Sequence, residues 1–243
     1  MFSRIWKKIK SFFSRSPVIN DPVKPIDLSK LPRSVSGSSN GKEMKRGDCF
    51  ADVSRYAPVD FTKFIGTDLI FKATQGAYKL DKTLAKNITA CQSRGIRWGA
   101  YHFYECGVNP INQAKFFIDS VGYNLLTKCH HLPIVDYEKW DRHQNERDLK
   151  NDKENLLKFC ECIFKNTGRK VRIYTGDWLM SYLEFDNRFL EFCDLPWIAN
   201  YSKKPINFGP WGRMWAWQFA AGEDKKFKVA GIGWCDGNKF YGN

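Results

Sequence analysis

The sequence has no apolar run approaching the ~20 residues that a membrane-spanning helix needs. It has no C-x-x-C spacing, since its closest cysteine pair is Cys160-x-Cys162, and this excludes the usual zinc motifs. No secretory signal is evident, because charges interrupt every apolar stretch near the N-terminus. We therefore expect a protein made in the cytoplasm with mostly free thiols, although an even count of eight cysteines leaves disulfides open after export.

The composition indicates a folded protein with an anionic partner. A chain of 243 residues can form one barrel-sized domain or two smaller ones, and a hydrophobic content of 43% supports a sizeable core. Aromatic residues make up 16% of the chain, and their faces can stack on sugar rings as well as fill a core. The net charge of +13 favours nucleic acid, an acidic membrane surface or an acidic cell-wall polymer as the partner.

The first fifteen residues, MFSRIWKKIKSFFSR, predict a cationic amphipathic helix at 1–15. Bulky apolar side chains recur at helical spacing and cations occupy the rest of the surface, a pattern suited to an anionic membrane. A helix docked on the main domain and a basic arm for nucleic acid are the alternatives. The membrane-binding candidates are Phe2, Ile5, Trp6, Lys7, Lys8, Ile9, Lys10, Phe12 and Phe13.

Residues 16–46 have the composition of a flexible linker. They contain four prolines and a run rich in serine and glycine at 34–42, with little apolar surface to offset the entropy of ordering. Roughly eleven basic and three acidic residues precede position 48, so the remainder is only mildly basic. The charge therefore relates to delivery more than to the domain that follows.

From residue 47 onward, short apolar strands alternate with helical patterns. Helices are predicted at 82–94, 110–123 and 148–166. This βα alternation predicts a parallel sheet, and about eight strands in ~195 residues predict a barrel over 47–243. The last three strands lie too close together for full helices between them, so the barrel should be irregular there. The predicted strands are 48–53, 68–73, 97–103, 132–137, 170–175, 196–201, 214–219 and about 234–240.

The fourth predicted strand ends in two carboxyl groups, Asp136 and Glu138, separated by Tyr137. Alternate residues of an extended chain point the same way, so the two acids share one face, roughly 7 Å apart. Glycoside hydrolysis needs such a pair, because one acid protonates the leaving oxygen and the other supports positive charge at the sugar carbon. The alternative is an ordinary strand end that becomes polar as it meets water.

Other polar residues should meet this pair, because functional side chains of a parallel barrel lie where its strands end. Individually they have simple explanations: Asp52 could cap a turn, and His102 alone is better explained as a structural histidine. Their convergence on one rim is what predicts a site. The strand-end residues are Asp52, Thr74–Gln75, His102, Asp136, Glu138, Tyr174, Asn200–Tyr201, Gln218 and Asp236.

The order of short motifs resembles that of the glycoside hydrolase family 25 lysozymes, the muramidase group that includes Chalaropsis-type and many phage lysins. The resemblance covers about residues 47–243, and eight weak motifs in one order make it specific. They are A-D-V-S-R-Y at 51–56, F-K-A-T-Q-G at 71–76, G-A-Y-H-F at 99–103, V-D-Y-E at 135–138, R-I-Y-T at 172–175, W-I-A-N-Y at 197–201, W-Q-F at 217–219 and C-D-G-N-K-F at 235–240.

The resemblance implies an α/β fold, the irregular TIM-like (β/α)5(β)3 barrel, and hydrolysis of the β-1,4 bond between N-acetylmuramic acid and N-acetylglucosamine in peptidoglycan. It implies no metal and no cofactor. Glu138 maps to the general acid, Asp136 to the second D-x-E acid, and Asp52 and Asp236 to the acids of the first and last strands. The positions that it implies line the saccharide site are Tyr101, Tyr137, Tyr174, Trp197 and Gln218.

For the mechanism, we expect Glu138 to be protonated at rest and Asp136 to stay ionised, as nucleophile or as the group that orients the substrate's acetamido group. The sequence departs from the family at Ala51, where a branched residue is usual, and no wall-binding repeat is recognised after the barrel. We expect a monomer that acts on peptidoglycan glycan strands at the cell wall or periplasm and is phage-encoded. Anionic membrane or lipopolysaccharide would be a second partner, through the N-terminal helix.

Three rival functions use the same observations. A chitinase-like barrel usually carries another aspartate two residues before the acid pair, where this chain has Ile134. A barrel that binds glycan without cutting it would be marked by loss of the acids, and all four are present. A nucleic-acid binder would explain +13, but the charge is concentrated at the front, no nucleic-acid motif is recognised, and we expect no nucleic-acid partner.

Overall fold

The computed structural model describes residues 43–140 and 143–242. The predicted helix at 1–15 and most of the predicted linker at 16–46 lie outside these residues. Eight strands form a ring in the order β1-β11-β8-β7-β6-β5-β4-β2, which the pairing of β1 with β2 closes. They are β1 (Cys49–Val53), β2 (Asp68–Gln75), β4 (Arg97–Phe103), β5 (Ile134–Asp136), β6 (Val171–Gly176), β7 (Cys193–Ala199), β8 (Ala216–Ala220) and β11 (Asp236–Phe240).

Seven strands of the ring run parallel, whereas β11 is antiparallel to both of its neighbours, β1 and β8. A short strand, β3 (Lys79–Leu80), adds to the outer end of β2. The predicted irregular TIM-like (β/α)5(β)3 barrel is confirmed. The fourth predicted strand, 132–137, is shorter than expected, because β5 begins at Ile134 and stops at Asp136, which leaves Glu138 two residues beyond it.

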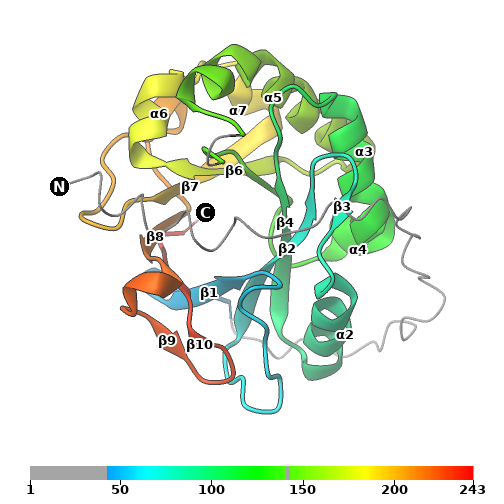
Figure 1. Cartoon of the computed structure of the whole chain (residues 1–243), viewed down its shortest axis with the longest axis vertical. Helices are drawn as coiled ribbons and strands as arrows, with labels where there is room; N and C mark the ends of the chain where they lie inside the picture. Colours follow the sequence, from blue (N-terminus) through cyan, green and yellow to red (C-terminus); the bar gives the residue numbers. More distant parts are fainter. Residues whose placement is uncertain (1–42, 141–142, 243) are drawn as a thin grey trace.

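Helices surround only part of the ring (Figure 1). They lie outside β2 to β7, whereas the side formed by β1 and β8 carries the small hairpin of β9 (Lys228–Val229) and β10 (Gly233–Trp234). The three long helices match the prediction within a few residues; the short helices and the hairpin were not predicted. The helices are α2 (Leu84–Arg94), α3 (Pro110–Val121), α4 (Tyr123–Lys128), α5 (Glu146–Thr167), α6 (Asp177–Leu183) and α7 (Phe189–Phe192).

The long helices begin where the sequence supplies caps. Before α3, the Asn109 side chain accepts hydrogen bonds from two backbone N–H groups, and Pro110 occupies the first turn, where its missing N–H costs nothing. Helix α5 begins with a reciprocal capping box between Asn145 and Asp148 and ends at Gly168, whose φ of 69° suits glycine. These caps set where each helix crosses the outside of the barrel.

Strand alternation divides the apolar residues into two cores. Side chains such as Val135 and Ile173 point outward and pack under the helices. The neighbouring residues in the same strands point inward. Phe50, Ile134 and Trp197 are among them and belong to a separate cluster inside the ring. The barrel is therefore a filled core, and the polar residues at its two ends are held on a packed floor.

Two further findings concern the described residues as a whole. None of the helices within 43–140 and 143–242 has the length and apolar character needed to cross a bilayer. All eight cysteines lie in these ranges and all are free thiols, seven of them buried or half-buried.

Candidate active site

Four carboxyl groups meet at the rim where the parallel strands end. Asp52 is the penultimate residue of β1 and Asp136 the last of β5, while Asp236 is the first residue of β11. Because β11 runs the opposite way, its beginning lies at the same rim as the ends of the others, and Asp236 pairs directly with Asp52 in the ladder. Asp52 and Asp136 are buried, whereas Glu138 and Asp236 are half-buried and reach further out.

Asp136 and Glu138 behave as a coupled pair of acids joined by a hydrogen bond between their side chains. Burial, opposed chiefly by the charge of Lys72, raises the pKa of Glu138 to about 7. Burial and then the charge of Glu138 hold the pKa of Asp136 well above its usual range. Two carboxyl groups this close cannot both ionise easily, so they share a proton near neutral pH.

The expectation that Asp136 stays ionised is wrong for the substrate-free protein. Its Oδ1 is buried without a hydrogen-bond donor among the described residues. An ionised carboxylate left without a donor in a buried place is costly, which favours the protonated form of Asp136. Glu138, at the outer position, remains able to take that proton.

Asp52 is held by a network of amides. Its Oδ2 accepts hydrogen bonds from Asn238 Nδ2 at 2.6 Å and from Gln218 Nε2 at 3.0 Å. Gln218 Oε1 in turn accepts from the hydroxyl groups of Tyr174 and Tyr201, each at 2.7 Å. Burial raises the pKa of Asp52 to about 6, and the two amide donors oppose that rise. The network fixes the carboxylate in place while keeping it ionisable near neutral pH.

Asp236 is anchored from the other side of the rim. Its Oδ1 accepts a hydrogen bond from the backbone N–H of Gly222 at 2.7 Å. Burial and then the charge of Asp52 raise the pKa of Asp236 to about 8. Of the three acids Asp52, Glu138 and Asp236, Asp52 is therefore the readiest to ionise and Asp236 the least ready.

Lys72 is the cation of the site, and the sequence reasoning did not single it out. Its Nζ donates to Gln75 Oε1 at 2.9 Å and lies 4.4 Å from the centre of the Phe103 ring. Burial lowers the pKa of Lys72 to about 8, and the charge of Asp136 opposes this. Strand alternation could have identified Lys72. It lies two positions after the inward-facing Ile70, so its side chain also points into the ring, in a strand that is otherwise buried.

Tyr137 was predicted to line the saccharide site, and the structure shows this to be wrong. Its side chain is fully buried on the helix side of β5, and its hydroxyl donates to Leu149 O in α5 at 2.5 Å. The reason is strand alternation: a residue between two inward-facing acids must point outward. His102 also points outward, bonded to Thr74 and Gln113, and burial lowers its pKa to about 3, as a structural histidine requires.

The other four predicted lining residues lie inside the ring, at different depths. Tyr101 is half-buried, and its pKa is raised by burial and then by the charges of Asp136, Asp52 and Asp236, so it lies next to the acids. Tyr174 and Gln218 are buried and reach the acids through the amide network. Trp197 is 2% exposed and lies beneath, where its indole N–H donates to Asn238 at 2.8 Å. Direct contact between Trp197 and a saccharide does not fit this position.

Four exposed aromatic side chains follow the ends of parallel strands at the same rim. Tyr56 follows β1, Tyr78 follows β2, Trp178 follows β6 and Tyr201 follows β7, and each is between 39% and 57% exposed. Tyr78 donates to the buried Glu105 at 3.0 Å, which fixes its ring. Flat exposed rings around an acid cluster suit stacking on sugar faces. The described residues contain no cluster of three or more His, Cys, Asp or Glu arranged to hold a metal ion.

A closed barrel with a proton-sharing pair of acids at the carboxyl ends of its strands has the architecture of a glycoside hydrolase. The sequence agrees: residues 51–226 match the family described as glycosyl hydrolases family 25, and the chain belongs to that family. The protein is therefore a glycoside hydrolase.

Known proteins resemble the chain over most of its length. The uncharacterized protein YegX of Escherichia coli (strain K12) is 27% identical over 214 residues, covering 85% of this chain and 75% of YegX. A family 25 glycosyl hydrolase from Bacillus anthracis superposes with a TM-score of 0.65 at 24% identity, covering 83% of this chain and 93% of the other. A bacterial lysozyme from Streptomyces coelicolor superposes with a TM-score of 0.65 at 22% identity, covering 82% of this chain and 94% of the lysozyme. The two structures show that the fold is shared.

Proposed function

We propose that the protein is a lysozyme that hydrolyses the β-1,4 bond between N-acetylmuramic acid and N-acetylglucosamine in bacterial peptidoglycan. Family membership supports the reaction class, and the bacterial lysozyme that shares the fold supports the substrate. The observation that carries the proposal is the Asp136–Glu138 pair, which shares a proton at the rim and leaves Asp136 Oδ1 without a donor.

Glu138 is the proposed general acid. Its pKa of about 7 keeps a proton available near neutral pH, and it is the more exposed member of the pair. It donates this proton to the glycosidic oxygen as the bond to the sugar carbon breaks. The resulting carboxylate then takes a proton from the water that completes hydrolysis, which restores the starting state.

Asp136 is the proposed partner of the substrate's 2-acetamido group. An amide N–H from the substrate supplies the donor that Asp136 lacks, so substrate binding favours ionised Asp136 and moves the shared proton to Glu138. The aligned acetamido oxygen then attacks the sugar carbon from the opposite face, and water opens the cyclic intermediate with net retention. Direct attack by Asp136 is the second route, and a trapped glycosyl-enzyme would identify it.

Asp52 and Asp236 have supporting roles in this proposal. Asp52 ionises most readily of the four and would stabilise positive charge at the sugar carbon. Asp236, when ionised, raises the pKa of Glu138 and so helps Glu138 to keep its proton. Tyr56, Tyr78 and Trp178 offer rings on which the glycan strand can stack on either side of the acids.

The decisive experiment is mass spectrometry of fragments released from purified peptidoglycan. New reducing ends on muramic acid are expected, with retained configuration. Reducing ends on glucosamine, or peptide cleavage without new reducing ends, would contradict the proposal. Chitin is the matched second substrate: faster release from chitin than from peptidoglycan would favour a chitinase instead.

The front of the chain remains a separate proposal, because residues 1–15 lie outside the described residues. Their segregated aromatic and cationic side chains would bind anionic lipid or lipopolysaccharide and bring a cytoplasmically made enzyme toward the wall. Deleting 1–15 should reduce binding to anionic liposomes while turnover on isolated wall is unchanged. Equal liposome binding by both forms would remove the idea.

A further inference from the structure

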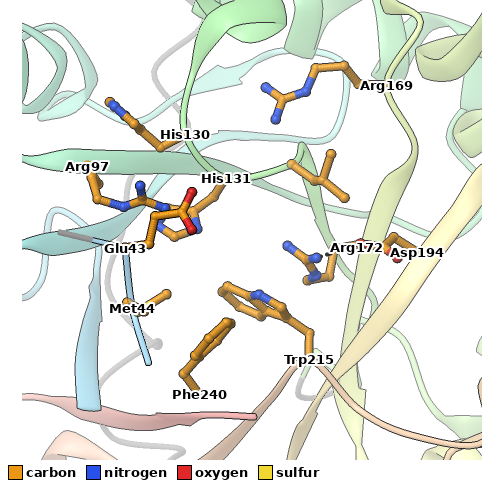
Figure 2. Close-up of a pocket in the computed structure, with 11 residues that line it drawn as sticks. Glu43, Met44, Arg97, His130, His131, Arg169, Arg172, Asp194, Trp215 and Phe240 are labelled. Atoms are coloured by element: carbon orange, nitrogen blue, oxygen red, sulfur yellow. Dashed lines mark hydrogen bonds and ion pairs between the residues drawn. The ribbon is translucent and has the colours of Figure 1, made fainter. Parts of the chain in front are cut away.

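A cavity lies at the end of the barrel opposite the four acids. It has a volume of about 340 Å³ and is lined by residues from the beginnings of β4, β6 and β7, from the end of β11, and from the segments that precede β1, β5 and β8 (Figure 2). Trp215 and Phe240 form an aromatic floor, with their rings 5.9 Å apart. The proposed hydrolysis uses none of these residues.

The most buried charge in this cavity is the guanidinium of Arg172, which is 2% exposed. Its Nε donates to Leu195 O at 3.1 Å, its Nη2 donates to Asp194 at 2.7 Å, and its Cζ lies 4.1 Å from the centre of the Trp215 ring. These contacts fix the guanidinium and leave Nη1 without an acceptor among the described residues. A fixed, largely desolvated donor of this kind matches an oxyanion.

Arg169 adds a positive charge that no described carboxylate neutralises. Its Nη1 donates to Leu126 O and Cys129 O, both at 2.8 Å, and to Cys129 Sγ at 3.2 Å, so uncharged acceptors hold the side chain. Arg97, by contrast, is paired with Asp68 at 3.1 Å. Two of the three arginines of the cavity are therefore paired with carboxylates, and the guanidinium of Arg169 is not.

The cationic groups of the cavity also repel one another. Burial lowers the pKa of Arg172 to about 10, Asp194 opposes this, and Arg169 lowers it further. His131 is fully buried and bonded to Asp68 at 2.8 Å, yet burial keeps its pKa below the usual value, with Arg172 and Arg97 adding to the effect. A bound anion would relieve this repulsion, which a neutral ligand could not do.

Glu43 lies at the mouth of the cavity and is exposed. It makes no ion pair within 4 Å with any described residue, although it lines the same space as Arg97 and Arg169 (Figure 2). Its carboxylate can therefore act as a weak internal competitor for an incoming anion. Replacing Glu43 with glutamine therefore alters the charge of the cavity without removing any ion pair among the described residues.

We propose that this cavity is a binding site for a small phosphate-class oxyanion, either inorganic phosphate or a phosphate monoester. The free edges of Arg172 and Arg169 contact the oxygens, and Trp215 and Phe240 accommodate the remainder of a monoester. Several guanidinium groups with a fixed fork geometry suit the three terminal oxygens of a dianion better than they suit chloride. The volume exceeds what phosphate alone requires, which leaves room for a sugar-sized group.

The test is calorimetric titration of the full-length protein with inorganic phosphate, against chloride at matched ionic strength. We expect one saturable phosphate site. Its affinity for phosphate should be at least threefold higher in Glu43→Gln and at least tenfold lower in Arg172→Met. Arg169→Gln should also weaken phosphate binding. Because the Arg169 side chain is less buried, this variant replaces Arg172→Met as the test if Arg172→Met does not fold. Lys63→Gln, an exposed lysine, is the control and should bind as the wild type does.

Glucose 1-phosphate in a parallel titration separates the two sources: tighter binding than phosphate supports a monoester, and weaker binding supports the free ion. Absence of saturable binding by 10 mM in the wild type would overturn the site, as would unchanged affinity in both Glu43→Gln and Arg169→Gln. The Glu138→Gln variant should bind phosphate normally, so this result is independent of whether the lysozyme proposal holds.

Discussion

Gln218 of β8 donates a 3.0 Å hydrogen bond to Asp52 of β1, and this bond links the acid cluster to two tyrosines. Both ends of the amide are used: Nε2 donates to Asp52, and Oε1 accepts from Tyr174 and Tyr201. The Gln218 amide carries no charge, so its main effect on the Asp52 carboxylate is to fix the orientation of that group.

Replacing Gln218 with methionine should raise the pKa of Asp52 and destabilise the fold by about 1–3 kcal/mol, because a buried carboxylate loses a donor and two hydroxyl groups lose their acceptor. Urea unfolding and the acidic limb of the pH–rate profile measure the two effects. Tyr201→Phe removes one hydroxyl only and is the control. An unchanged acidic limb in the glutamine variant would show that Asp52 is not the group titrating there.

Replacing Glu138 with glutamine should lower turnover on peptidoglycan by about 10²–10⁴-fold, the usual contribution of a general acid. The same change should stabilise the folded protein above pH 7, because it removes a carboxyl group that is costly to ionise where it lies. Wall-clearing assays and thermal unfolding at pH 8 measure both. Glu191→Gln, on an exposed helix position, should change neither quantity, and wild-type clearing by the Glu138 variant would reject the assignment.

The acid cluster should make the protein less stable as the pH rises from about 4 to 8. Burial raises the folded-state pKa values of Asp52, Glu138 and Asp236 to about 6, 7 and 8, so the folded protein binds more protons than the unfolded chain in this range. The free energy of unfolding therefore falls as the pH rises through these values.

Thermal unfolding between pH 4.5 and 8.5 measures this dependence. Asp236→Asn should flatten the curve and raise the melting temperature most at the alkaline end, whereas Asp119→Asn, an exposed control, should leave the slope unchanged. A wild-type melting temperature that increases from pH 5 to 8 would contradict the raised pKa values.

Replacing Lys72 with methionine should raise the pKa of both Asp136 and Glu138, since Lys72 lowers both. We expect the alkaline limb of the pH–rate profile to move upward by about one unit and turnover at pH 6 to fall about tenfold, because Asp136 becomes harder to ionise. Lys63→Met controls for loss of a cation at the surface. A downward shift of the limb would mean that Lys72 does not act on the pair.

Replacing Tyr137 with phenylalanine should leave KM and kcat unchanged and cost about 1 kcal/mol of stability, the usual net value of one hydrogen bond. The hydroxyl donates to Leu149 O behind the strand, away from the rim. Steady-state kinetics on soluble glycan fragments and urea unfolding provide the measurement. An increase in KM without loss of stability would restore the saccharide-lining role.

The acids could be predicted from the sequence because their positions follow from two simple rules. Asp136 and Glu138 lie two apart at the end of an apolar run, and Asp52 ends another such run, so parallel strands bring them to one rim. Asp236 is different: it was placed at the rim with the other strand-end residues, but it lies at the beginning of its strand and reaches the rim only because β11 runs antiparallel, which the sequence pattern did not show.

The errors also have identifiable causes. Tyr137 was assigned from the family motif although strand alternation already placed it on the opposite face from its neighbours. Lys72 was overlooked because a lysine in a strand is normally a solvated residue, and only the inward direction of its side chain makes it part of the site. Helices of four to seven residues, such as α7, give too few turns for a periodic signal.

The reversed direction of β11 has a consequence for the order in which the protein is made. The strand synthesised first carries Asp52, and its partner Asp236 arrives only with the last one, so a chain still on the ribosome holds an incomplete set of acids. The barrel also stays open until β11 inserts between β1 and β8. Assembly of the four acids is thereby tied to the synthesis of β11, and a shortened polypeptide lacking β11 would lack both Asp236 and the strand that closes the ring.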